Sequence, residues 1–294
     1  MDRSLCFSPY VEAIPYLSEN RRNKMENKVE IAKEVRRNIV KMVYTAKSGH
    51  PGGSLSAVEA LVSLYFGEMN IDPAQPGLEE RDRFVLSKGH ITPAYYSVLA
   101  ERGYFPKEEL ASFRKMDSRL QGHPCMQECP GVDMSTGSLG QGISCAVGMA
   151  LSAKLRNRNY RVYTLLGDGE LEEGQVWEAC MFAGHRKLDN FTMIIDNNNL
   201  QIDGTIDQVC SPYPIDEKLA AFGFSVTHVD GHNFEELDAA YKKARETKGK
   251  PSAIIAHTVK GKGVSFMENQ ASWHGQAPGK EQYEQAMKEL GGEI

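Results

Sequence analysis

Polar residues and glycines gather directly after three apolar, β-branched stretches of the sequence. The strings GDGE (167–170), DNNN (196–199) and KGKG (260–263) follow RVYTLL, FTMII and AIIAHTV. A carboxylate combined with amide and carbonyl oxygens suits a hard cation, and magnesium keeps coordination positions open for phosphate oxygens and water. One helix and one strand separate Asp168 from Asn198, so both side chains can face one crevice. The pair therefore suggests a bound magnesium diphosphate.

Each of these strings also has a plainer interpretation. GDG alone is a common tight turn between a strand and a helix, and DNNN alone is a common polar turn. A magnesium-dependent phosphohydrolase that uses Asp168 as nucleophile or ligand is a second enzyme class that fits. Lys260 and Lys262 are balanced between a phosphate-facing role and an ordinary solvated loop. The spacing of GDG and DNNN favours the diphosphate site over separate turns.

The elements that must position these residues alternate between strand and helix. Short apolar strands are expected at 84–87, 161–168, 191–198, 224–229 and 252–259. Helices are expected at 31–49, 55–69, 92–103, 106–116, 142–157, 172–188, 215–222, 233–246 and 280–290. This alternation predicts an α/β fold with a doubly wound, mostly parallel sheet. In such sheets, ligands bind at the carboxyl ends of the strands, where the polar strings lie.

Composition excludes several classes of protein. The 294 residues carry 34 Lys and Arg against 39 Asp and Glu, a net charge of -5, which disfavours nucleic acid as a partner. The apolar stretches are shorter than the ~20 residues of a membrane span, and residues 1–28 lack the pattern expected of a secretory signal. We therefore expect no membrane association and a cytoplasmic protein, with six cysteines present as reduced thiols. Cys125 and Cys129 lie near His123, but no second Cys/His pair supports a soft-metal site.

Eight ordered strings give the sequence a specific resemblance from about Val29 onward. They are SGHPGGSLS (48–56), RDRFVLSKGH (81–90), QGHP (121–124), STGSLGQG (135–142), GDGELEEGQVWEA (167–179), DNNNLQIDG (196–204), DGHN (230–233) and WHGQAP (273–278). Together they resemble the amino-terminal, diphosphate-binding domain of transketolase. The resemblance implies the thiamine diphosphate-binding fold over residues 29–294, preceded by an extension at residues 1–28.

The resemblance assigns cofactors and roles to particular residues. It implies thiamine diphosphate with magnesium, or another divalent cation such as calcium or manganese. It assigns the cation to the side chains of Asp168 and Asn198 and to the Leu200 carbonyl. The residues implied to bind the cofactor itself are His90, Gly137, Leu139, Gly169, Asn198 and His274.

Histidines carry the implied catalytic roles. His50, His123 and His274 would line the substrate channel, where sugar hydroxyls exchange protons near neutral pH. The other four histidines, His185, His228, His232 and His257, are expected to be structural, and His232 to lie in a turn that caps the next helix. Glu173 and Glu178 match family glutamates near a dimer interface, and their alternative interpretation is exposed helix carboxylates.

Transketolases have two further domains, which normally follow this one in the same chain. The chain ends at Ile294, after a polar helix, which favours the amino-terminal subunit of a split transketolase over a truncated product. We therefore expect a carboxy-terminal partner subunit, a heterotetramer, and transfer of a two-carbon ketol unit from a ketose phosphate to an aldose phosphate. Alternatives are a related transferase with a modified sugar, a deoxyxylulose-phosphate-synthase-like activity, and a non-catalytic subunit of the same fold.

Overall fold

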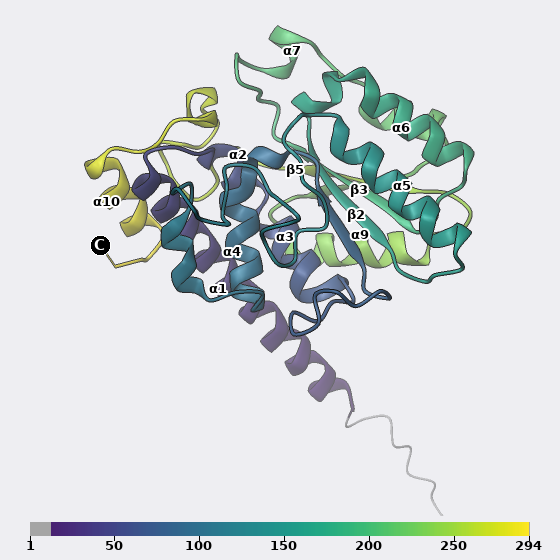
Figure 1. The fold of residues 1–294 in the computed structure, drawn as a ribbon, viewed down its shortest axis with the longest axis horizontal. Coiled ribbons are helices and arrows are strands. Elements are labelled where there is room, and N and C mark those ends of the chain that lie inside the picture. The colour runs from purple at the N-terminus through teal and green to yellow at the C-terminus, as the bar shows by residue number, and fades with distance from the viewer. Residues whose placement is uncertain (1–12, 294) are drawn as a thin grey trace, which may run out of the picture.

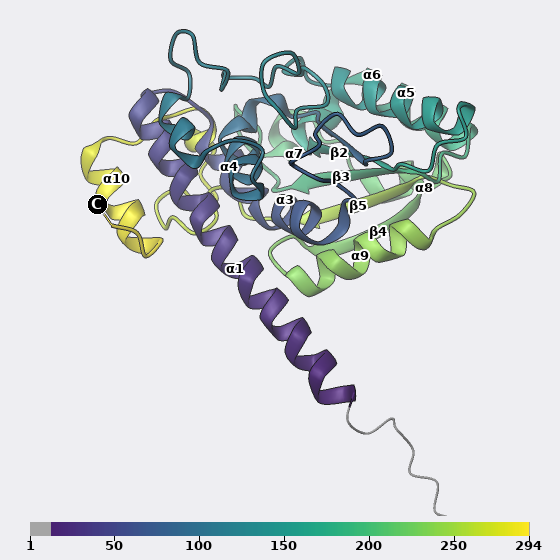
Figure 2. The same ribbon diagram turned by 60° about the horizontal axis from the view of Figure 1, so that its bottom comes forward.

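A computed structural model describes residues 13–293 of the chain. Its first element is the long helix α1 (Ala13–Ala46), which runs out from the body toward the amino terminus in Figure 2. The helix was expected only from residue 31, so that start is wrong. The stretch SENRRNKMENK (18–28) is polar, with no apolar period to reveal a helix. Residues 1–12 of the expected extension, including Cys6, lie outside the described residues.

Five parallel strands form one sheet in the order β1-β2-β3-β5-β4. The strands are β1 (Arg83–Leu86), β2 (Val162–Gly167), β3 (Phe191–Asn197), β4 (Ser225–Asp230) and β5 (Ser252–His257). All five were predicted, with bounds within two residues at each end. Because every connection returns the chain to the same end of the sheet, the carboxyl ends of the strands share one edge.

Helices cover both faces of the sheet, as the view in Figure 1 shows. On β2, Tyr163 and Leu165 pack into the core cluster that also holds α1, α3 (Val58–Ser63), α4 (Thr92–Arg102) and α9 (Phe234–Glu246). Val162 and Leu166 point the other way, into the cluster with α5 (Gln141–Leu155), α6 (Gly174–His185) and α8 (Ile215–Ala221). The alternation of side chains along a strand thus builds two cores, which confirms the doubly wound fold.

Two further predicted helices differ in the structure. The helix expected at 55–69 is broken into α2 (Pro51–Ser56), α3 and a π-helical turn (Leu64–Glu68), with the break at Ala57. The helix expected at 106–116 is a short 3-10 segment (Lys107–Ser112). It ends before Arg114, which has φ of +58° and donates its N–H to Leu120 instead of continuing a helix.

The remaining elements are short segments near the carboxyl edge and a terminal helix. They are the 3-10 turns at Gly89–Ile91, Gly169–Glu172 and Ala271–His274, and the helices α7 (Ile206–Val209) and α10 (Lys280–Glu289). Over residues 13–293, no helix has both the length and the apolar character needed to cross a membrane.

Candidate functional site

A hollow of about 570 Å³ opens at the carboxyl edge of the sheet. Polar residues that follow β1, β2 and β3 line it, as the parallel topology predicts. Of the predicted site residues, the structure brings into its lining His50, His90, Gly137, Leu139, Asp168, Gly169, Asn198, Leu200 and His274. Only His123 is not part of the lining.

Asp168 is a buried carboxylate at the end of β2. Its Oδ1 accepts the Gly169 N–H at 2.9 Å, and its Oδ2 accepts from Asn197 Nδ2 at 3.2 Å and from the Asn199 N–H at 2.5 Å. Burial, reinforced by the nearby Asp196 carboxylate, raises the pKa of Asp168 to about 6. A buried carboxylate with a raised pKa gains from a cation beside it, so Asp168 fits the role of a metal ligand.

Neutral oxygens complete a set of donors that suits magnesium. Asn198 is buried with its Oδ1 near the Leu200 N–H at 3.1 Å, and the Leu200 carbonyl faces the Lys260 ammonium at 3.3 Å. Among residues 13–293, no three His, Cys, Asp or Glu side chains converge as a metal cluster, and this includes Cys125 and Cys129. A cation here would therefore have one carboxylate, neutral oxygens and open positions for phosphate.

An ion pair that the sequence analysis missed lies beneath this set. Lys88 Nζ contacts Asp196 Oδ2, and both side chains are buried. Ser56 Oγ and Thr258 Oγ1 donate to the same carboxylate, one to each oxygen. Burial alone would raise the pKa of Asp196, but Lys88 and these hydroxyls hold it below its usual value. Lys88 stands in the SKGH string directly after the predicted strand 84–87, and that position could have marked it as a site residue.

Glu170 was also missed, and it holds three segments of the site together. Its Oε1 accepts from Ser87 Oγ at 2.5 Å and from the Gly140 N–H at 3.0 Å, while Oε2 accepts the Gly167 N–H at 3.3 Å. Burial raises its pKa. Glu170 therefore fixes the glycine-rich loop that ends at Gly140 against the ends of β1 and β2.

Three histidines form a triangle of rings at one side of the hollow. The ring centroids lie 5.0 Å apart for His50 and His90, 5.1 Å for His90 and His274, and 5.4 Å for His50 and His274. Burial, with Arg114 as the next cause, lowers the pKa of His50 to about 4. Burial also lowers the pKa of His90 well below its usual value and, together with Lys260, that of His274 to about 3. The three rings are therefore neutral near pH 7.

His50 and His274 differ in the partners of their Nδ1 atoms. Nδ1 of His50 is buried and has no hydrogen-bond partner among residues 13–293. Nδ1 of His274 lies 3.0 Å from Lys260 Nζ and accepts from it. His274 therefore keeps its proton on Nε2.

The two lysines of the KGKG string have different surroundings. Lys260 is buried in the lining of the hollow, which agrees with a phosphate-facing role. Lys262 lies outside the hollow and pairs with Glu268 at 3.7 Å, as expected of a residue in a solvated loop.

His123 lies beside the hollow, exposed and against Gly137. A Cβ placed on Gly137 would come 2.8 Å from His123 Cδ2, and φ at this glycine is +149°, a conformation that other residues rarely adopt. Partial burial of the ring, and then Arg114, lower the pKa of His123. The structure places this histidine at the rim and leaves its catalytic role a prediction.

Two further expectations concern residues at the edge of the site. Glu173 is exposed where α6 begins and also lines the hollow, and Glu178 is exposed on α6. Their interface role stays a prediction. His232 lies in the turn before α9, as expected, and Asn233 of that turn caps the helix with an Oδ1 that accepts two backbone N–H groups. The His232 ring itself contacts Glu59 and Val259.

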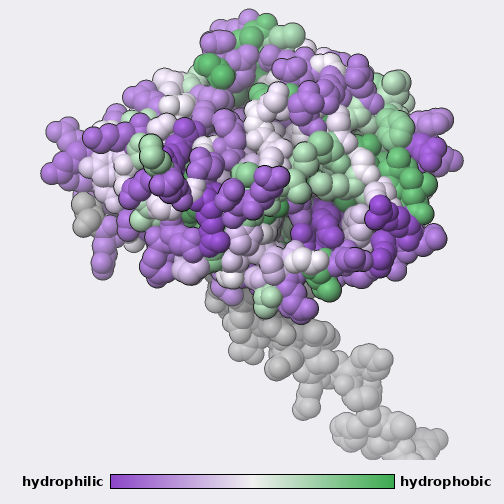
Figure 3. Space-filling view, in the orientation of Figure 1, coloured by the Kyte–Doolittle hydropathy of each residue, from purple (hydrophilic) through white to green (hydrophobic). Residues whose placement is uncertain are grey.

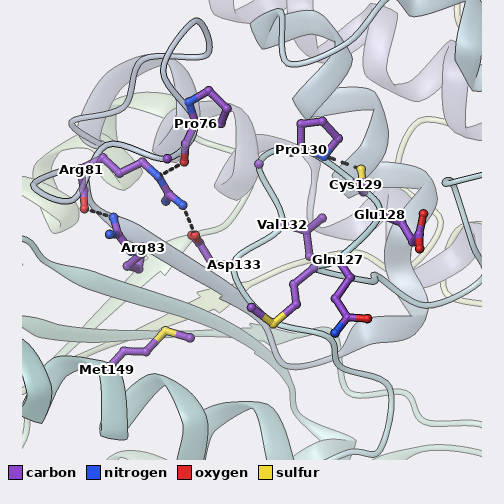
Figure 4. A pocket seen from close by; sticks show the side chains of 13 residues that line it. Pro76, Arg81, Arg83, Gln127, Glu128, Cys129, Pro130, Val132, Asp133 and Met149 are labelled. Carbon is purple, nitrogen blue, oxygen red and sulfur yellow. Dashed lines mark hydrogen bonds and ion pairs between the residues drawn. The ribbon is translucent and has the colours of Figure 1, made fainter.

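A second hollow, shown in Figure 4, lies elsewhere and contains no predicted site residue. It measures about 600 Å³ and lies between the loops at 76–83 and 126–133. Arg81 pairs with Asp133 at 2.5 Å, and Arg83 donates to backbone carbonyls such as that of Glu79 at 3.0 Å. With both arginines already satisfied, this hollow offers no free arginine for a substrate.

Comparison with known proteins identifies the family. Residues 27–293 match the family described as "Transketolase, thiamine diphosphate binding domain". The chain belongs to the transketolase family. Its fold agrees with that of the transketolase from Leishmania mexicana, with a TM-score of 0.85 at 34% identity over 90% of this chain and 41% of that one. As a member of this family, the chain is a transferase domain that binds thiamine diphosphate.

Several transketolase relatives are themselves separate subunits. The chain is 48% identical to the "6-deoxy-6-sulfo-D-fructose transketolase subunit SqwG" of a Clostridium strain, over 82% of this chain and 88% of that protein. It is 43% identical to an apulose-4-phosphate transketolase subunit of Phocaeicola vulgatus, over 87% of this chain and 90% of that protein. Against Homo sapiens transketolase, at 42% identity, it covers 43% of that protein.

Proposed function

We propose that this chain is the amino-terminal subunit of a split, magnesium-dependent transketolase. The observation that carries the proposal is the convergence of Asp168, Asn198, the Leu200 carbonyl and the His90 ring on one hollow at the sheet edge. The subunit-sized relatives support a second chain that supplies the rest of the enzyme.

The residues around the hollow fit a metal diphosphate. Asp168, Asn198 and Leu200 would hold the cation through oxygen, and the Gly169 backbone N–H would meet a diphosphate oxygen. His90 would hold the diphosphate, and Gly137 and Leu139 would meet the cofactor through the backbone of their loop. When bound, thiamine diphosphate supplies the carbanion chemistry that amino-acid side chains lack.

The neutral histidines would handle protons around that cofactor. His50, a neutral ring in the lining of the hollow, would accept a proton from or donate one to a sugar hydroxyl. His274 presents Nε2–H as a donor, because Lys260 occupies its Nδ1. His123 at the rim would contact the more distant part of the substrate.

Substrate and partner follow from the relatives as proposals. We propose a ketose phosphate donor, an aldose phosphate acceptor and a carboxy-terminal partner that carries the remaining domains. The sulfofructose and apulose phosphate relatives make a modified sugar the specific alternative. Because the five described cysteines are all free thiols, we also propose a reducing, cytoplasmic setting.

An apolar face on α5 and α6 supports self-association into a heterotetramer. Leu155 is 68% exposed, Met181 57% and Phe182 43%, and these helices lie where Figure 3 shows apolar side chains at the surface. Large exposed apolar groups of this kind mark interaction surfaces. We propose that two copies of the chain meet here, next to Glu173 and Glu178.

Calorimetry tests the proposed cofactor site. Thiamine diphosphate titrated into the chain should bind in the presence of Mg²⁺ and lose affinity at least tenfold when EDTA removes the metal. Release of phosphate from simple phosphate esters without the cofactor would instead support a phosphohydrolase. Absence of any metal-dependent binding, with or without a partner subunit, would contradict the proposal.

A further inference from the structure

His232, in the DGHN string, connects two loops through its ring. Its Nε2 accepts the Val259 N–H at 2.9 Å, and its Nδ1 lies 2.9 Å from Glu59 Oε2. A nitrogen that accepts a backbone N–H carries no proton, so the ring proton is on Nδ1 and is donated to Glu59. The ring is therefore neutral and fixed at both ends, with a side chain only 14% exposed.

Glu59 and Arg36 extend this contact through the protein interior. Arg36 Nη1 lies 2.7 Å from Glu59 Oε1, and Arg36 Nη2 donates to Oε2 at 2.8 Å, a two-pronged pair between buried side chains. Arg36 Nε also donates to the Lys262 carbonyl at 3.1 Å. The network of Arg36, Glu59 and His232 thus holds the turn at Val259 on one side and at Lys262 on the other.

This turn places the Lys260 side chain in the cofactor hollow. Inside the turn, the Gly261 N–H donates to the Gly52 carbonyl at 2.9 Å, with φ of +79° at Gly261. The Lys260 side chain passes against Gly52, where an added Cβ would lie 3.2 Å from Lys260 Cγ. Its ammonium then reaches the Leu200 carbonyl and His274 Nδ1.

We propose that Arg36, Glu59 and His232 form a positioning network that sets where the Lys260 ammonium stands in the cofactor hollow. His232 is the positioning residue of the network, since it acts on Lys260 only through the backbone of Val259. The consequence for cofactor binding rests on the proposed function, whereas the placement of Lys260 does not.

Chemical labelling of the cofactor-free chain tests the placement directly. In the wild type, buried Lys260 should react with acetic anhydride far more slowly than the exposed Lys280, as followed by mass spectrometry of peptides. His232→Phe keeps a ring but accepts no hydrogen bond, and it should raise Lys260 labelling at least tenfold relative to Lys280. His232→Gln, whose amide oxygen can accept the Val259 N–H, should restore most of the protection. His185→Phe, at an exposed histidine, is the matched control and should change nothing.

A double-mutant cycle on cofactor affinity tests the connection to the hollow. His232→Phe should weaken binding of magnesium thiamine diphosphate by about tenfold, because the charged Lys260 ammonium would no longer be held in place as a hydrogen-bond donor. In a Lys260→Met background, the same change should have little further effect. Equal, additive losses in both backgrounds, with Lys260 still protected, would overturn the inference. If His232→Phe does not fold, His232→Asn, too short to reach Val259, replaces it.

The two arms separate failure of the inference from failure of the proposed function. If the wild type binds no thiamine diphosphate but His232→Phe exposes Lys260, the network stands and the cofactor assignment fails. If the wild type binds the cofactor and His232→Phe changes neither labelling nor affinity, the network is wrong.

Discussion

Replacing Gly89 with Ala should damage both the stability of the chain and its cofactor site. A Cβ on Gly89 would lie 2.7 Å from the Gly137 backbone nitrogen, 2.7 Å from Thr136 Oγ1 and 2.8 Å from the Thr136 carbonyl carbon. Two of these are backbone atoms, which cannot rotate away. Overpacking of this kind costs about 1 to 3 kcal/mol. Displacing Thr136 also strains its hydrogen bond to the Leu86 carbonyl, now 2.6 Å, for about 1 kcal/mol more.

Urea unfolding measures this cost, and Gly148→Ala is the matched control. Gly148 lies in α5 with no atom within 4 Å of an added Cβ, so alanine there should stabilise the chain by up to about 1 kcal/mol. We expect Gly89→Ala to lower the free energy of unfolding by about 2 to 4 kcal/mol. It should also weaken magnesium-dependent cofactor binding, because the Gly137 loop moves. Wild-type stability and affinity in Gly89→Ala would refute the steric reasoning.

Three further predictions concern the ionisable residues. Asp168→Asn should abolish magnesium-dependent binding of thiamine diphosphate in calorimetry, whereas Asp203→Asn, at an exposed position of the same loop as Asn198, should not; equal affinity in both would remove Asp168 from the metal site. His123→Ala should lower turnover of the assembled enzyme more than cofactor affinity, and unchanged turnover would remove this histidine from catalysis. By NMR titration, His50 should stay neutral to about pH 4 and His274 to about pH 3. Because unfolding frees both rings to take up protons near pH 6.5, stability should fall as the pH drops below 6.5; a midpoint near 6.5 in the folded chain would contradict their burial.

The sheet, and the position of the site at its carboxyl edge, were predictable because short stretches of sequence indicate both. Each strand is a short apolar run, and the polar residue that follows it is fixed at the carboxyl edge by the parallel topology alone. Asp168 and Asn198 were therefore identified as neighbours before any contact was visible. The start of α1 gave no such signal, since a polar helix lacks an apolar period.

The contacts that site residues make with distant partners were not predictable. Lys88 and Lys260 come from turns far apart in the sequence, and only the folded chain buries them in one hollow. His232 was correctly placed in a turn, but its ring contacts were not foreseen, because Glu59 and Val259 lie far away in the sequence. Glu170 sits in the recognisable GDGE string, yet its bond to the Gly140 N–H appears only after the glycine loop has folded over it.

Two-carbon transfer in a reconstituted mixture tests the central claim most directly. The purified chain would be combined with a carboxy-terminal transketolase subunit, Mg²⁺ and thiamine diphosphate, with xylulose 5-phosphate as donor and ribose 5-phosphate as acceptor, and then with modified sugars. The proposal predicts transfer to at least one acceptor in the mixture and none with either chain alone. Transfer by the chain alone, or no transfer of any sugar by a pair that has assembled and bound the cofactor, would contradict it.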